Sequence, residues 1–88
     1  MPITLNTACE MNPQVAIRPE PFGALAYHYG NRKLVFLKDP DVVAVVRDLA
    51  QYPTLAATLE AVGVHHDRWP SFVNAVDSLY SSDIVRVR

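Results

Sequence analysis

The residues that could do chemistry are few, and their spacing does not build a reactive site. His65, His66 and Asp67 stand next to one another. Neighbouring residues point to different faces of a helix, whereas metal-binding pairs spaced i, i+4 reach one ion together. We interpret this triplet as a solvent-exposed helix start, and we predict no metal site and no cofactor.

The sequence does not support nucleophilic catalysis either, because that requires Ser or Cys held beside His and an orienting carboxylate. Cys9, the only cysteine, lies in a segment without clear periodicity, while Ser81 and Ser82 follow a helix as its fraying end. Asp39 and Asp41 are explained by a helix N-terminus, whose dipole favours anions. We therefore predict that the chain is not an enzyme.

Composition indicates one small globular domain. Of the 88 residues, 50% are hydrophobic and 19% are charged, only 3 are Gly, and the formal net charge is −1. Such a chain lacks both a phosphate-cradling glycine loop and the positive field that attracts nucleic acid. Because we find no signal peptide, no apolar run of membrane length and only one cysteine, we expect a cytoplasmic protein without a membrane or nucleic-acid partner.

The first elements of the chain are an arm and a short strand. Residues 1–13 show no helical or strand periodicity and are predicted to be a flexible N-terminal arm, followed by one domain over residues 14–88. Val15 and Ile17 alternate with less apolar residues and indicate a strand. Pro19 and Pro21 are then expected to stop its pairing, since Pro has no N–H to donate.

Residues 23–29 and 33–38 are predicted to form a β-hairpin around a two-residue loop of Gly30 and Asn31, which tolerate positive φ. This loop would pair Tyr27 with Leu34. We expect one face of the hairpin to belong to the core and His28 to lie alone on the outer face. The side chains predicted to face the core are Leu25, Tyr27, Leu34 and Phe36, with Val35 and Leu37 on the other face.

Three helices follow. Asp39 and Pro40 have the residue types of an N-cap and a first helical position, Thr54 caps a second helix that Gly63 ends, and a third helix begins near Asp67. The order predicts an α+β fold that is winged helix-turn-helix-like, with a three-stranded antiparallel sheet followed by a three-helix bundle. Residues 84–88 are expected to be extended.

A winged-helix DNA-binding regulator is the alternative that this shape raises. A recognition helix presents Arg, Lys, Asn or Gln on its exposed face. The third helix offers Arg68 and Asn74 but also Asp67 and Asp77, so that face is close to neutral. The charge therefore favours a partner other than DNA.

The third strand is the most informative segment. Residues 34–37 are apolar on both faces and are bracketed by Lys33 and Lys38. In an up-down-up sheet this strand is an edge, and a long apolar edge needs a cover. Residues 84–88, a second copy in a homodimer, or a bound peptide would each provide one, and the pattern alone does not choose among them.

The hairpin carries a resemblance to a known family. Residues 18–25 (RPEPFGAL), 27–34 (YHYGNRKL) and 36–38 (FLK) resemble the mycofactocin-system precursor-peptide chaperone, and the likeness continues more weakly over residues 14–88. That family is similar to the PqqD-like chaperone of pyrroloquinoline quinone synthesis. Its domain is called the RiPP recognition element, where RiPP denotes a ribosomally made, enzymatically modified peptide.

The resemblance implies a peptide chaperone without chemistry of its own. Such a chaperone binds a short precursor peptide and delivers it to a radical S-adenosylmethionine maturase in redox cofactor biosynthesis. Iron–sulfur clusters and S-adenosylmethionine belong to that enzyme, so no cofactor is expected in this chain. A purely structural subunit of the maturase is a further alternative.

The resemblance also implies where the peptide binds, namely as an added strand beside the third strand, in a groove against the third helix. Carried over to this sequence, the strand residues are Lys33, Leu34, Val35, Phe36, Leu37 and Lys38. The helix residues are Arg68, Phe72, Ala75, Val76 and Leu79.

Overall fold

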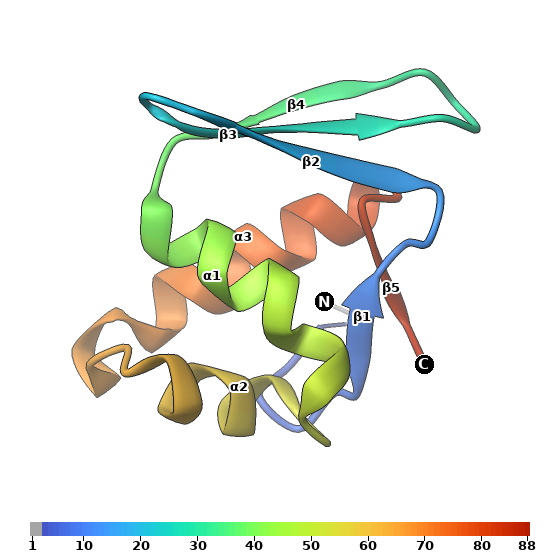
Figure 1. Ribbon diagram of the computed structural model, residues 1–88. Coiled ribbons are helices and arrows are strands. Elements are labelled where there is room, and N and C mark those ends of the chain that lie inside the picture. The colour runs from blue at the N-terminus through green and yellow to red at the C-terminus, as the bar shows by residue number, and fades with distance from the viewer. Residues whose placement is uncertain (1–2) are drawn as a thin grey trace.

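The structure is a computed structural model in which residues 3–88 are described, and it has a sheet layer over a helical layer (Figure 1). A three-stranded antiparallel sheet of order β2-β3-β4 lies across the helices, and β1 pairs with β5 in a separate two-stranded sheet. The strands are β1 (Cys9–Met11), β2 (Val15–Glu20), β3 (Gly23–His28), β4 (Leu34–Leu37) and β5 (Val85–Val87). The helices are α1 (Pro40–Asp48), α2 (Leu55–Val62) and α3 (Trp69–Ser81), with 3₁₀ turns at Leu49–Gln51 and His66–Arg68. The predicted α+β fold is confirmed.

The helix boundaries follow from local side-chain chemistry, as predicted. Asp39 caps α1, because its Oδ1 accepts the backbone N–H of Asp41 at 2.9 Å. Thr54 caps α2 through a bond from the N–H of Ala57 at 3.1 Å. Gly63 ends α2 with φ of 88°, a left-handed conformation that costs Gly little.

The register of the β3–β4 hairpin is as predicted, but its faces are reversed. Leu25 pairs with Phe36 and Tyr27 with Leu34. The prediction that these four side chains form the core is wrong, since Leu34 is 52% and Phe36 is 61% exposed. They lie on the outer face of the sheet, away from the helices.

Small side chains face the helices instead. Ala24 and Ala26 of β3 are fully buried, and Leu37 of β4 is 4% exposed. A strand whose inner residues are alanines lets helices approach closely, so the buried face is the one that packs closely and not the one with the larger apolar side chains. The sequence showed that side chains alternate between the two faces of the strand, but which set is buried depended on what packs against the strand.

Hydrogen bonding between the two strands extends to His28 and Lys33, so the loop that joins them has four residues, 29–32, rather than two. The N–H of Arg32 donates to the carbonyl of His28 at 2.8 Å, and the N–H of His28 donates to the carbonyl of Lys33 at 3.0 Å. Arg32, not Gly30 or Asn31, adopts a positive φ, of 61°. The predicted two-residue turn was therefore wrong. The longer loop has the same midpoint, between Gly30 and Asn31, and so gives the same register.

Pairing of β2 continues through Pro19, which was expected to stop it, and ends at Glu20, before Pro21. Pro19 pairs with Ala24 and Glu20 with Gly23. The N–H of Tyr29 donates to the carbonyl of Gln14 at 2.8 Å, which places the ladder bonds of β2 at its even-numbered residues. Pro19 therefore falls where its missing N–H would point to the open edge, a position that tolerates Pro.

The described part of the N-terminal segment packs on the helical layer. Ile3 is fully buried, the carbonyl of Leu5 accepts the N–H of Ala56 at 2.9 Å, and β1 pairs with β5 through Cys9 and Val87. The sequence did not predict this strand. Burial raises the pKa of the Cys9 thiol, against a smaller lowering by Arg88, and so makes the thiol less reactive. The domain boundary at residue 13 stays a prediction, and residues 1 and 2 of the predicted arm lie outside the described residues.

Replacing Gly23 with Ala is expected to destabilise the domain by more than about 3 kcal/mol. Gly23 has φ of 144°, a conformation nearly restricted to Gly, and a Cβ there would overlap the carbonyl oxygen of Leu37. Chemical denaturation of the two proteins measures the loss. Gly63→Ala is the matched control, because that Cβ would meet nothing within 4 Å and should cost only about 1–2 kcal/mol. Equal losses at both positions would contradict the steric argument.

Candidate peptide-binding groove

An apolar groove runs between β4 and the helices. Its volume is about 400 Å³, within the range of ligand sites. One wall is the edge of β4, and the other is formed by the beginning of α1 and the second half of α3. The lining residues are Val35, Phe36, Leu37, Lys38, Asp39, Val42, Ala75, Ser78, Leu79 and Ser82.

The groove brings together six of the eleven residues carried over from the resemblance. These are Val35, Phe36, Leu37, Lys38, Ala75 and Leu79. Of the others, Lys33 precedes β4 and is exposed, and Leu34 points to the outer face. Phe72 and Val76 are 2% and 0% exposed, so they lie in the core rather than on the groove surface.

The sequence reasoning missed part of the groove. Val42 belongs to the apolar stripe of α1 and is half-buried, which is the signal of a residue at the margin of a core. Ser78 lies one turn after Asn74 on α3, and Ser82 follows the helix. Small polar residues carry no periodic signal, so only the packing of α3 beside β4 identifies them as groove residues.

Arg68 is engaged within the protein. Its Nη1 lies 2.7 Å from Asp41 Oδ2, its Nη2 lies 2.9 Å from Asp39 Oδ2, and its guanidinium carbon lies 5.0 Å from the centre of the Phe72 ring. The hydrogen bond to Asp41 raises the pKa of the guanidinium further. Arg68 therefore joins the start of α1 to the segment before α3, and two carboxylates offset its charge.

One edge of β4 has no strand beside it in the part of the chain that the structure describes. The order of the sheet is β2-β3-β4, so β3 lies along one side of β4 and the other side of β4 is the edge of the sheet. β5 pairs with β1 through Val85 and Met11 and does not reach β4. Residues 84–88, one of the three covers that the sequence allowed, therefore do not cover this edge.

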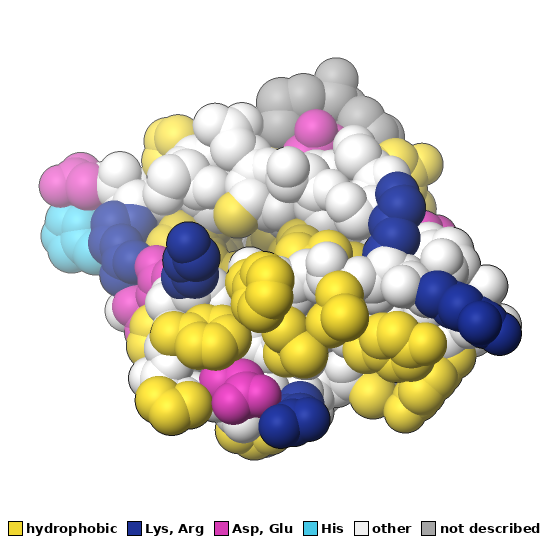
Figure 2. Space-filling view, turned by 90° about the horizontal axis from the view of Figure 1, so that it is seen from above, with side chains coloured by type: hydrophobic (Ala, Val, Ile, Leu, Met, Phe, Trp, Pro, Cys, Tyr) yellow, Lys and Arg dark blue, Asp and Glu magenta, His cyan; other side chains and the backbone are white. Residues whose placement is uncertain are grey.

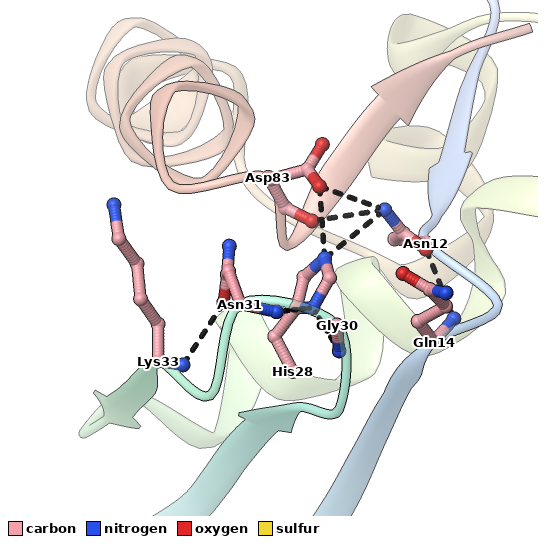
Figure 3. A network of polar contacts seen from close by, with 7 residues as sticks. All are labelled: Asn12, Gln14, His28, Gly30, Asn31, Lys33 and Asp83. Atoms are coloured by element: carbon pink, nitrogen blue, oxygen red, sulfur yellow. Dashed lines mark hydrogen bonds and ion pairs between the residues drawn. The ribbon is translucent and has the colours of Figure 1, made fainter.

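A buried network holds the loop from which β4 starts (Figure 3). His28 is 2% exposed, so its predicted place on the outer face is wrong. Its Nδ1 accepts the backbone N–H groups of Gly30 at 2.9 Å and Asn31 at 3.1 Å. Because Nδ1 accepts both bonds, the ring proton sits on Nε2, which donates to Asp83 Oδ2 at 2.8 Å.

The same network ties three distant segments together. The Nδ2 of Asn12, before β2, donates to the carbonyl and to Oδ2 of Asp83, each at 3.2 Å. Asp83 follows α3 and has φ of 62°, while Asn31 Oδ1 accepts the N–H of Lys33 at 2.9 Å. His28 thus connects the end of α3 to the first residue of the candidate edge. Sequence reasoning missed this role, since its partners are remote along the chain.

Replacing His28 with Leu should destabilise the domain by about 2 kcal/mol or more, because it leaves two loop N–H groups without an acceptor and removes one of the two side-chain donors to the Asp83 carboxylate. Amide exchange should accelerate most at Gly30 and Asn31. His65→Leu is the control, since His65 is exposed and accepts a single local bond from the N–H of Asp67. If both variants melted and exchanged alike, the network would not be what holds the loop.

Together, the sheet, its uncovered edge and the apolar groove define a small α+β binding domain. Within residues 3–88, no cluster of three or more His, Cys, Asp or Glu side chains could hold a metal ion, and no helix is long and apolar enough to cross a membrane.

The chain belongs to the MftB peptide chaperone family, whose model matches residues 8–86. It is 44% identical over 75 residues to the peptide chaperone MftB of Mycobacterium tuberculosis, a match that covers 85% of this chain and 69% of that protein. It is 47% identical over 75 residues to the peptide chaperone MftB of Mycolicibacterium smegmatis, covering 85% and 74%. No solved structure matches the chain significantly. The family indicated by the hairpin motif is confirmed, and with it a chaperone rather than an enzyme.

Proposed function

We propose that this chain binds the mycofactocin precursor peptide as an added strand along residues 33–38, and that it delivers the peptide to a radical S-adenosylmethionine maturase in the cytoplasm. The observation that carries the proposal is the uncovered edge of β4 beside an apolar groove. An exposed sheet edge offers backbone donors and acceptors to any extended chain, and neighbouring pockets then select its side chains.

The ladder indicates which backbone groups a peptide would meet. The bond from His28 N–H to the Lys33 carbonyl makes these two residues a hydrogen-bonded pair of the β3–β4 hairpin. Because such pairs alternate along an antiparallel ladder, Val35 and Leu37 also bond to β3. The N–H and C=O groups of Leu34 and Phe36 are then the ones directed to the open edge.

Main-chain bonds alone would not hold the peptide. Four of them would contribute roughly 2–6 kcal/mol, since each is worth about 0.5–1.5 kcal/mol net. Association itself costs at least about 4 kcal/mol. Apolar contacts with Val35, Val42 and Leu79 must supply the difference, which favours leader residues with aliphatic or aromatic side chains on alternate positions. Lys33 and Lys38 flank the edge and favour an acidic leader, weakly because both are exposed.

The charge of α3 weakens the DNA-binding alternative. Trp69–Ser81 contains no Lys and no Arg, and Asp77 is its one charged residue. Arg68, the cation nearest to its start, is paired with Asp39 and Asp41. A helix of this composition lacks the donors and the positive charge that major-groove contacts require.

Strand addition predicts a specific pattern of amide exchange. When the precursor peptide binds, the amides of Leu34 and Phe36 should gain protection, because they acquire partners. Those of Val35 and Leu37 should change less, because they already bond to β3. Smaller gains are expected along residues 68–80. Protection confined to α1 and α2 would place the peptide elsewhere and refute this mechanism, while leaving a chaperone role intact.

The chaperone role itself predicts binding without chemistry. Calorimetry should show that the purified chain binds the precursor peptide in the absence of the maturase, and the mass of the peptide should stay unchanged. A structural subunit of the maturase would bind the enzyme but not the peptide. Tight, steeply salt-dependent binding to random duplex DNA would instead support the regulator alternative.

A further inference from the structure

We propose that the outer face of the β2-β3-β4 sheet is the surface on which the maturase docks while the groove holds the peptide. This inference rests on the proposed function and assigns the enzyme its own surface. By the outer face we mean the exposed side of the sheet, formed by Phe22, Leu25, Tyr27, Tyr29, Leu34 and Phe36.

The outer face is a continuous apolar surface. Phe22, Tyr29, Leu34 and Phe36 are 43%, 63%, 52% and 61% exposed and account for four of the six large hydrophobic side chains that are exposed among residues 3–88. Figure 2 looks onto this side of the molecule and shows the yellow side chains gathered over the sheet. Single exposed apolar residues are ordinary, but a contiguous patch marks an interaction site.

Aromatic contacts order this surface before any partner arrives. The rings of Phe22 and Phe36 meet edge to face with centroids 5.7 Å apart, and those of Tyr27 and Tyr29 do so at 5.1 Å. Rings held by one another lose little side-chain entropy when a partner covers them. Such a patch suits protein recognition, where aromatic anchors carry much of the binding energy.

The outer face stays open when the groove is filled. The helices lie on the opposite side of the sheet (Figure 1), and β4 sends Leu34 and Phe36 outward but Val35 and Leu37 inward. Phe36 also lines the groove, so the two surfaces meet at this ring. A peptide strand added to β4 would extend the outer face, and a docked enzyme would then touch the peptide as well.

The charges around the outer face indicate the chemistry of the partner. Around this face lie four exposed cations, Arg18, Arg32, Lys33 and Lys38, and Glu20 lies 3.1 Å from Arg18. Asp39, next to Lys38, is paired with Arg68. The four cations and Glu20 together carry a net charge of +3, on a chain whose net charge is −1. Figure 2 shows dark blue side chains around the yellow ones, with magenta side chains beside some of them. The complementary surface is apolar at its centre and acidic at its border.

The same charges argue against a second copy of this chain. In a twofold symmetric contact the same patch meets itself, so two positive borders would face each other. The area of the outer face also argues against a stable homodimer. Four aromatic and aliphatic side chains, about half exposed, offer roughly 300–500 Å², whereas a stable interface buries about 800 Å² per partner. A contact of this size is typical of a transient complex, as expected for a carrier that dissociates from its partner.

The test compares two variants that avoid the groove and residues 33–38. Phe22→Ser combined with Tyr29→Ser removes two exposed rings, and Arg32→Asp reverses a border charge with a residue type that tolerates the left-handed conformation. Binding to the mycofactocin maturase is measured by surface plasmon resonance, and binding to the precursor peptide by calorimetry. Tyr80→Ser and Arg47→Asp, which are exposed on the helices, are the matched controls.

We expect the double variant to weaken maturase binding at least about tenfold, with peptide affinity and melting temperature unchanged. Arg32→Asp should slow association and reduce its salt dependence, while the controls behave like wild type. Unchanged maturase binding in both outer-face variants would overturn the inference and leave the proposed function standing. A wild-type dimer that the double variant abolishes in sedimentation would assign the face to a second copy instead. If the wild type bound no peptide, the proposed function itself would fail.

Discussion

The close approach of the helices to the β2-β3-β4 sheet is the constraint on which the rest of this structure depends. Ala24 and Ala26 are fully buried at that contact, and their small side chains leave room for the valines of α1. Because the inner face of β3 takes alanines, the large residues Leu25 and Tyr27 of the same strand are directed outward. One packing choice therefore produces both a tight core and an aromatic outer face.

The position of β4 follows from a second constraint, the polar network around His28. A buried histidine that accepts two backbone N–H groups and donates to a carboxylate has all its bonding capacity satisfied, which is how a polar side chain is tolerated in a core. Through Asp83 the network joins the end of α3 to the loop before β4. The two walls of the groove are thus held relative to each other by hydrogen bonds and not only by apolar contact.

β4 offers three different surfaces because a strand alternates its side chains and its backbone groups. Its inner side chains line the groove, its outer ones belong to the aromatic face, and its free backbone groups point along the sheet. In the proposed function, a carrier holds a peptide and approaches an enzyme at the same time. A single edge strand of four residues, Leu34–Leu37, would serve both purposes.

Local chemistry in the sequence was enough to determine the order of the three-stranded sheet and the helices, the caps at Asp39 and Thr54, the glycine that ends α2, and the register of the hairpin, because each depends on residues a few positions apart. The hairpin motif was likewise sufficient to identify the family. Only the tertiary structure decided which face of the hairpin is buried, where Arg68 and His28 find their partners, and that residues 9–11 form a strand with residues 85–87. These outcomes depend on contacts between segments far apart in the chain. The alternation of side chains along a strand is visible in the sequence, but which set is buried is decided only when another element packs against one face.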